Sequence, residues 1–189
     1  MSEVTLESLG DWSRTHTCGE LTRADQNLYV VLMGWVHRVR DHGGVLFLDV
    51  RDRYGITQAV VPPSVAGPEV VERARLLGSE WVIALKGKVV ERPADAVNDS
   101  LPTGAIEVHV QELKILNHAE TPPFPVADDI DVSEDLRLKY RYLDLRRPRL
   151  KDTILLRHKA ALETRIYLSG RSFVEIETPM LVKPTPEGA

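Results

Sequence analysis

The sequence predicts an all-β five-stranded barrel, followed by a hinge and by the start of an α+β domain. Three observations lead to this prediction. Five segments with strand-like alternation occur between residues 28 and 117, one short helical segment interrupts them after the third, and a proline-rich linker then precedes helical sequence. Three strands, a helix and two further strands is the element order of an OB-fold barrel.

Turn and breaker residues bound each expected element. The first strand is apolar on both of its alternating faces, which is typical of a curved barrel strand, and Gly34 is its expected bend or bulge. Asp41 to Gly44 is expected to connect a hairpin, and Pro62 ends the third strand. The strands are expected at residues 28–40, 45–51, 56–61, 81–91 and 106–116, and the helix at residues 68–77.

The sequence after the barrel changes to a helical pattern. Residues 121–125, Thr-Pro-Pro-Phe-Pro, form a stiff linker. An amphipathic helix is expected at 153–168, ended by Gly170, and a strand at 173–177. The helix residues expected to face a core are Ile154, Ala161, Leu162 and Ile166. One helix and one strand cannot close a core, so this domain is expected to be truncated. The expected division into N-terminal extension and lead-in, barrel, linker with hinge, and second domain is 1–27, 28–117, 118–150 and 151–189.

Composition and charge narrow the classes of function. The chain has 43% hydrophobic and 28% charged residues and a single cysteine, Cys18, which favours a reducing, cytoplasmic setting without a disulfide. The first residues lack the basic and apolar regions of a signal peptide, and no apolar run approaches the roughly 20 residues needed to span a bilayer. A net charge of −4 argues against a protein that coats nucleic acid nonspecifically, but local basic patches remain allowed because charges are screened beyond about 8 Å. The six histidines have no metal-ligand spacing, so no metal site is expected.

The second expected strand carries a candidate base-stacking residue. Phe47 shares one face with Asp49 and Arg51, opposite the apolar face, and a phenylalanine among charged residues is out of place in a core. OB barrels bind single-stranded nucleic acid on this part of the sheet by stacking bases on aromatic rings. The alternative is a satellite core contact. Residues of neighbouring strands that could read base edges beside it are Arg40, Gln58 and Glu107, although each alone is more often plain surface.

Residues 133–147 combine cations with aromatic rings. Ser133 is the expected N-cap of a helix. The residues after it that are expected to contact phosphates and bases of an RNA are Arg137, Lys139, Arg141, Tyr142, Arg146 and Arg147. The alternative is a solvated hinge helix.

Four stretches of the chain resemble a known family. Residues 136–147, Leu-Arg-Leu-Lys-Tyr-Arg-Tyr-Leu-Asp-Leu-Arg-Arg, are similar to the hinge of bacterial-type aspartyl-tRNA synthetases. Residues 34–58 resemble their anticodon-binding domain, through Gly-Trp-Val-His-Arg and Phe-Leu-Asp-Val-Arg-Asp. Residues 170–181 resemble motif 1 of class II synthetases, and residues 185–189, Thr-Pro-Glu-Gly-Ala, resemble the start of the aspartate site. The implied second domain is therefore the truncated start of an α+β class II synthetase catalytic domain.

The resemblance implies roles for individual residues. Phe47 would stack on the middle uridine of the anticodon, Arg40 and Gln58 would read its edge and its neighbours, and Glu107 would meet the first anticodon base. Arg92 matches another arginine on the anticodon side. The remaining implied roles are aspartate binding for Glu187 and a dimer interface that includes Phe173 and Pro179.

Two positions bear on which tRNAs such an enzyme charges. His42 resembles nondiscriminating enzymes, which act on asparagine tRNA as well as aspartate tRNA. Asp95 departs from the glycine that the resemblance leads us to expect, and Ala96 departs from an asparagine found nearby in some relatives. Both charging patterns therefore stay open from the sequence.

The resemblance implies an aspartate–tRNA ligase in its complete form. That homodimeric enzyme would use ATP and Mg²⁺ to activate aspartate, and would bind tRNA but neither DNA nor a membrane. Its ATP-binding arginines belong to motifs 2 and 3, which this sequence does not contain, so we expect no catalytic residue, no bound cofactor and no activity in this segment alone. The alternatives are a relative specific for lysine or asparagine and a freestanding OB-fold module that binds RNA without catalysis.

Overall fold

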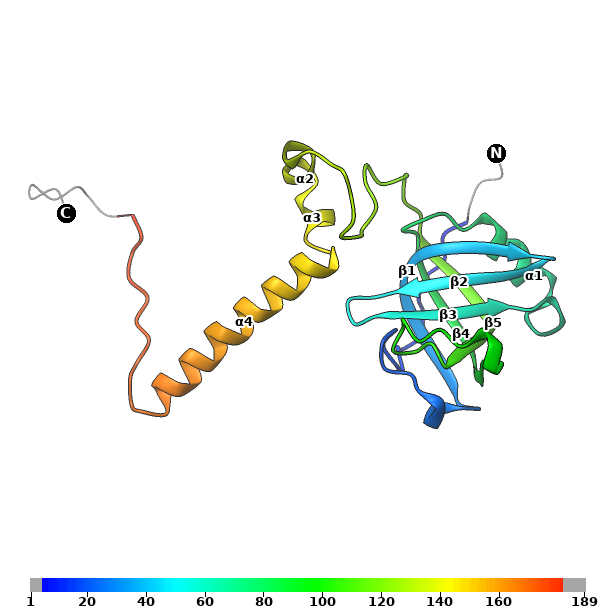
Figure 1. Ribbon diagram of the computed structural model, residues 1–189, viewed down its shortest axis with the longest axis horizontal. Helices are drawn as coiled ribbons and strands as arrows, with labels where there is room; N and C mark the ends of the chain where they lie inside the picture. The colour runs from blue at the N-terminus through cyan, green and yellow to red at the C-terminus, as the bar shows by residue number, and fades with distance from the viewer. Residues whose placement is uncertain (1–4, 182–189) are drawn as a thin grey trace, which may run out of the picture. The chain divides into compact units, whose positions relative to one another are not determined.

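Alternating apolar and polar residues build a closed five-stranded barrel in the first part of the chain (Figure 1). The computed structural model describes residues 5–181 and separates into two units, Met1–Pro123 and Phe124–Ala189. The strands are β1 Tyr29–His42, β2 Val45–Arg51, β3 Ile56–Val61, β4 Val82–Glu91 and β5 Ile106–Asn117. They follow one another around the barrel in the order β1-β2-β3-β5-β4, with β3 and β5 parallel and all other pairs antiparallel. The OB-fold prediction is confirmed.

The barrel core follows the pleat of each strand. In β2, Leu46, Leu48 and Val50 are buried, whereas Phe47 and Asp49 lie on the opposite, partly exposed face. Burying a leucine such as Leu48 stabilises the fold by about 1.5–3 kcal/mol relative to leaving it exposed. The same alternation therefore gives the barrel its core and one polar outer face.

The first strand differs from its prediction in two ways. It continues to His42, so the hairpin turn is confined to Gly43 and Gly44, which both have positive φ angles. The pairing of β1 with β2 shifts register at His37, between Val36 and Arg38, and not at the expected Gly34. A side chain at Gly34 would collide with the backbone of β2 where the two strands meet, so close approach explains this glycine.

The N-terminal segment packs into the barrel. Cys18 and Leu21 are fully buried within the core cluster. The Cys18 N–H donates to Asp52 Oδ2 at 2.9 Å, and the Thr57 hydroxyl donates to the Cys18 carbonyl oxygen at 2.8 Å. Residues before β1 thus contribute to the barrel as well as leading into it.

The helix between β3 and β4 begins earlier than predicted. Helix α1 spans Pro63–Leu76 and contains a kink at Gly67, whose φ of 75° lies outside the helical region. The expected start at Pro68 is the first residue after this kink, and Pro63 fits the first helical position because that position needs no N–H donor. The face that packs on the barrel includes Val71 and Ala74.

The second unit contains three helices in the described residues: α2 Glu134–Lys139, α3 Arg141–Asp144 and α4 Pro148–Ser169. Helix α4 starts five residues before its prediction, because the Asp128 carboxylate accepts the Arg149 N–H at 3.1 Å and thereby caps the first turn. Within the described part of the chain, no helix is long and apolar enough to span a membrane.

Two expectations for the second unit are wrong in this structure. The predicted strand at residues 173–177 is exposed chain without strand pairing, because a strand needs a partner that supplies hydrogen bonds. The predicted core face of α4 is also exposed, with Ile154, Leu162 and Ile166 at 44%, 43% and 56% and Ala161 likewise open to solvent.

Candidate nucleic-acid interface

A pocket with a volume of about 400 Å³ opens on the polar outer face of β1, β2 and β3. The loop between β4 and β5 forms its remaining wall. The lining residues are Arg38, Arg40, His42, Phe47, Asp49, Gln58, Arg92, Ala96, Asn98 and Leu101. Five residues that the sequence analysis singled out, His42 among them, are therefore brought together in one concave site.

Adjacent strands hold the polar groups of the pocket in register. Asp49 of β2 pairs directly with Gln58 of β3, and Arg40 of β1 pairs with Phe47 of β2. The Nη2 atom of Arg40 donates to Asp49 Oδ1 at 2.7 Å and also to Gln58 Oε1 at 3.1 Å. The barrel order therefore accounts for this contact between residues 18 positions apart in the chain.

The contacts continue from Gln58 into β5. Gln58 Nε2 donates to Glu107 Oε2 at 3.0 Å, and the other carboxylate oxygen, Glu107 Oε1, lies 2.9 Å from His109 Nε2. Glu107 does not line the pocket itself, but its carboxylate contacts a residue that does. The parallel pairing of β3 with β5 makes this possible.

Phe47 occupies the pocket wall and is partly exposed. Its ring and the His42 ring form a T-shaped pair, with 5.6 Å between the ring centroids and 76° between their planes. Both rings lie on the outer face, opposite the buried Leu46 and Leu48. An aromatic ring in a concave polar pocket can stack on a planar base.

Two buried donors of the pocket have no hydrogen-bond partner in the described part of the chain. Among the residues that the structure describes, Arg40 Nε and Arg92 Nη2 are the buried side-chain atoms without a hydrogen bond. Arg92 is 6% exposed, and its Nε donates to the Ile106 carbonyl oxygen at 2.8 Å. Burial lowers the pKa of Arg92 from its ordinary value, while the carboxylates of Glu107 and Asp49 oppose that change. Leaving a buried donor unsatisfied costs roughly 1–3 kcal/mol, so these atoms fit acceptors supplied by a ligand.

The β4–β5 loop contributes residues that the sequence analysis missed. Asn98 and Leu101 line the pocket, whereas Asp95 is exposed and does not. The Thr103 hydroxyl donates to the Ile56 carbonyl oxygen at 2.6 Å and so fixes the end of the loop on β3. No local pattern reveals this tertiary contact. Arg38 was also missed, although its alternation with Arg40 on β1 was a usable signal.

The hinge cations divide into internal and exposed groups. Asp144 is fully buried and pairs with Arg141 at 2.6 Å and with Arg147 at 3.0 Å. Arg147 also donates to the carbonyl oxygens of Ala127 and Asp128, at 2.8 and 2.9 Å. Arg147 therefore lies inside the second unit instead of on the expected RNA-facing surface, because its fork matches one carboxylate and two carbonyl groups.

The other predicted contact residues have different surroundings. Tyr142 is 67% exposed and packs edge-on against Tyr140, whose ring also carries the Lys139 ammonium at 5.5 Å. Arg137 and Arg146 are partly exposed. Of the predicted dimer-interface and aspartate-site residues, Phe173 and Pro179 are exposed, and Glu187 lies outside the described residues.

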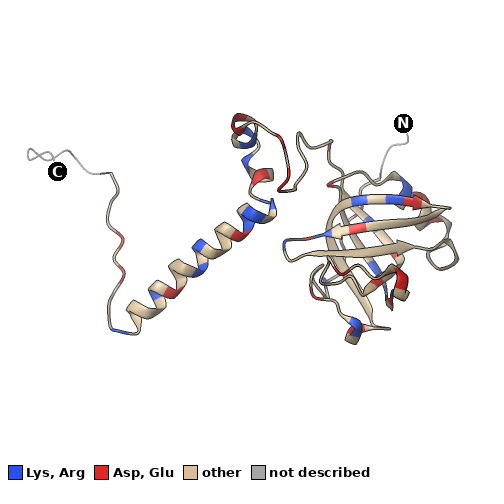
Figure 2. Cartoon of the chain, viewed as in Figure 1, with Lys and Arg blue, Asp and Glu red and all other residues tan. Residues whose placement is uncertain are grey.

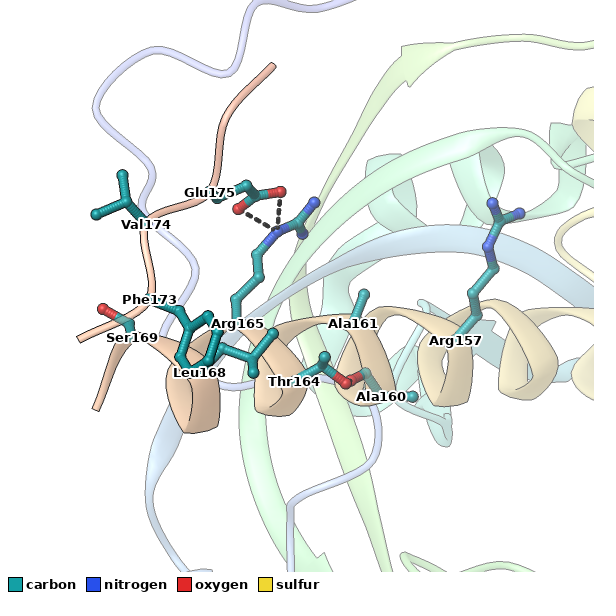
Figure 3. A pocket seen from close by; sticks show the side chains of 10 residues that line it. All are labelled: Arg157, Ala160, Ala161, Thr164, Arg165, Leu168, Ser169, Phe173, Val174 and Glu175. Carbon is teal, nitrogen blue, oxygen red and sulfur yellow. Dashed lines mark hydrogen bonds and ion pairs between the residues drawn. The ribbon is translucent and has the colours of Figure 1, made fainter. Parts of the chain in front are cut away.

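A second pocket, of about 900 Å³, lies between α4 and the segment after it (Figure 3). Arg165 of α4 points to Glu175 and donates to both of its carboxylate oxygens, at 3.0 and 2.9 Å. All the lining side chains are exposed, and basic residues recur along this helix (Figure 2). The described residues hold no group of three His, Cys, Asp or Glu side chains suited to a metal ion. We therefore place the candidate site on the barrel.

Two protein families match the chain, and together they cover more than half of it. Residues 30–116 match the family described as OB-fold nucleic acid binding domain, and residues 133–189 match the class II tRNA synthetases of the D, K and N group. Curated relatives match almost the whole chain. Aspartate–tRNA(Asp/Asn) ligases from Desulfotalea psychrophila and Syntrophotalea carbinolica are 56% and 52% identical over 99% and 97% of it.

The chain belongs to the family of class II aspartyl-tRNA synthetases. It spans about a third of the length of these curated relatives, 31% in both cases. The family match over residues 133–189 shows that the second unit is the beginning of a class II synthetase domain, which does not favour a freestanding RNA-binding module.

Solved synthetase structures share the fold. Asparaginyl-tRNA synthetase from Pyrococcus horikoshii, in complex with asparaginyl-adenylate, has a TM-score of 0.77 and is 30% identical, and the match covers 90% of this chain and 37% of that one. A structure from Leishmania major described as a putative aspartyl-tRNA synthetase has a TM-score of 0.79 at 22% identity, covering 93% and 37%, and shows the fold alone.

Proposed function

We propose that the barrel unit of this chain binds the anticodon of tRNA, and that the complete protein is an aspartate–tRNA ligase. One observation carries the proposal. The pocket combines a partly exposed Phe47 ring with two buried guanidinium N–H donors, Arg40 Nε and Arg92 Nη2, that have no hydrogen-bond partner among residues 5–181. An unstacked base offers what this pocket lacks, namely a flat face for the ring and acceptor atoms for the donors.

The direction of each hydrogen bond limits what the pocket can read. Arg40 only donates, so Gln58 must turn its oxygen toward Arg40 and its nitrogen toward Glu107. This leaves a second N–H and a second lone pair on the Gln58 amide, which match a base edge that presents one acceptor beside one donor, as uracil does. Glu107 only accepts and suits the paired N–H donors of a guanine edge.

The names of the curated relatives favour an enzyme that charges both aspartate tRNA and asparagine tRNA. Their name includes both aspartate and asparagine tRNA, and His42 lines the pocket in contact with the Phe47 ring. We propose that the complete enzyme charges both tRNAs and that Asp95, which is exposed beside the pocket, acts only at its rim.

The complete enzyme would use ATP and Mg²⁺ in the cytoplasm and act as a homodimer, with Phe173 and Pro179 at the interface and Glu187 at the aspartate. We assign no residue of this chain to ATP or Mg²⁺. The exposed or partly exposed hinge residues proposed to contact tRNA are Arg137, Lys139, Tyr142 and Arg146, while Arg141 and Arg147 support the hinge through Asp144.

The proposal is tested by binding of labelled anticodon stem-loops at one stated salt concentration. The loops carry GUC for aspartate, GUU for asparagine and an unrelated triplet, and fluorescence anisotropy gives each dissociation constant. We expect GUC and GUU to bind similarly and the unrelated loop to bind more weakly. Preference for GUC alone would assign a discriminating enzyme. Equal binding of all three loops would contradict anticodon recognition, because phosphate contacts alone carry no sequence preference.

A further inference from the structure

His109 lies next to the pocket without lining it. It is two residues after Glu107 on β5, so the two side chains share one face of the strand. The neighbouring strands pair His109 with Val60 of β3 and Lys88 of β4. Among the described residues, its side-chain partner is the Glu107 carboxylate, with Nε2 at 2.9 Å from Oε1. The side chain of His109 is 30% exposed and that of Glu107 is 13% exposed, so this contact is shielded from much of the solvent.

The chemistry of the pair fixes its direction. A carboxylate has no proton to donate, so His109 Nε2 must carry the hydrogen. Glu107 therefore accepts from His109 on Oε1 and from Gln58 on Oε2, at 2.9 and 3.0 Å. Each oxygen keeps a further lone pair that can accept a hydrogen bond from a ligand.

The hydrogen bond from His109 restricts a side-chain torsion of Glu107 that would otherwise be free to turn. The last side-chain torsion of glutamate is broad, so its rotamer alone does not fix the plane of the carboxylate. Two donors on different oxygens fix that plane, whereas one donor leaves it free to turn. Without His109, Glu107 would be held by Gln58 alone, and Gln58 is in turn oriented by Arg40.

We propose that His109 is a positioning residue that sets the plane of the Glu107 carboxylate for a purine with paired N–H donors, which is guanine, at the first anticodon base. This inference rests on the proposed anticodon binding. His109 itself touches no base in the proposal and acts only through Glu107. It therefore adds selectivity at one base and not affinity for RNA in general.

The test compares base preference in variants of the full 189-residue chain. Stem-loops with GUC, AUC and GAC separate the first base from the middle base. His109→Leu should reduce the preference for GUC over AUC by about three- to tenfold, which is the worth of one hydrogen bond, and should leave the preference for GUC over GAC unchanged. His109→Gln, whose amide can donate to Glu107, should restore most of the preference. His118→Leu, at an exposed histidine outside the pocket, is the matched control and should behave like the unaltered protein.

A double variant tests whether His109 affects base preference through Glu107. In Glu107→Gln the preference at the first base should already be lost, so adding His109→Leu should change it no further. An unchanged first-base preference in His109→Leu would overturn the proposal while leaving anticodon binding intact. Equal losses at the first and middle bases, without rescue by glutamine, would also overturn it and assign His109 a general structural role. Equal binding of all loops by the unaltered protein would overturn both the anticodon proposal and this one.

Discussion

At the scale of single residues, Phe47 is the decisive side chain of the pocket, because it alone offers a flat apolar face there. We predict that Phe47→Ala weakens binding of the GUC stem-loop by about 1–3 kcal/mol, the usual worth of one base stacked on an aromatic ring. Anisotropy titration at fixed salt measures the change. Phe47→Tyr keeps the ring and serves as the control. An unchanged affinity in Phe47→Ala would return Phe47 to a packing role beside His42.

His37 is expected to make the stability of the barrel depend on pH. Its Nδ1 lies 2.9 Å from Arg51 Nη1, and an arginine only donates, so the imidazole is the acceptor and is neutral. Burial, and then the charge of Arg51, lower the pKa of His37 in the folded state. The unfolded chain, with a histidine pKa of about 6.5, therefore binds a proton more readily. Stability from His37 is present above that pH and is lost as the pH falls through the lower, folded-state pKa.

The prediction is a pH-dependent difference between two proteins. In His37→Gln the amide oxygen can still accept from Arg51, but the side chain does not titrate. Urea unfolding between about pH 7.5 and pH 5 should show the free energy of unfolding of the unaltered protein falling relative to that of His37→Gln as the pH is lowered. A constant difference across this range would show that His37 does not titrate in the way its surroundings indicate.

At the scale of elements, helix α4 begins where Asp128 caps it. This carboxylate lies 21 residues away from the Arg149 N–H that it accepts, at 3.1 Å. We predict that Asp128→Ala destabilises the first turn by about 0.5–2 kcal/mol, as loss of other N-terminal caps does. Faster hydrogen exchange of the Arg149 amide is the measurement. Asp128→Asn retains a cap acceptor and should exchange nearly as slowly as the unaltered protein.

The same element shows where the sequence was sufficient and where it was not. All five strands were predicted to within two residues, because alternation is a local signal that the barrel then satisfies. The start of α4 was missed, since it depends on Asp128 from a distant segment. The burial of Arg147 was missed for the same reason, because the carbonyl oxygens of Ala127 and Asp128 that accept from it lie 20 and 19 residues away in the chain. The strand predicted at residues 173–177 lacks the pairing partner that alternation alone cannot supply.

The residues of the candidate site also include some that the sequence predicted and some that it did not. Arg40, Phe47 and Gln58 were predicted to lie together because strand alternation sets the face of each residue, and the barrel order β1-β2-β3 then makes them neighbours. Asn98 and Leu101 entered the pocket through a loop fixed by contacts beyond local sequence. Periodic elements were therefore predictable, and irregular ones were not.

At the scale of the whole molecule, the hydrophobic core cluster lies entirely within the first unit, from Cys18 to Ile115. A closed barrel also leaves no open sheet edge that would need another segment to cover it. We therefore predict that a fragment of residues 1–123 folds on its own as the barrel. Because the pocket and its polar contacts also lie in this unit, the fragment should prefer the same stem-loops as the full chain.

Two measurements check this prediction. Urea unfolding followed by tryptophan fluorescence should give a cooperative transition for the fragment, since Trp12, Trp35 and Trp81 all lie within it. Its preference for GUC over an unrelated loop should match that of the full chain, while its affinity for all loops falls equally if exposed hinge cations contact phosphates. A fragment that folds but has lost the preference would place the selective contacts in the second unit, and would contradict recognition by the barrel pocket.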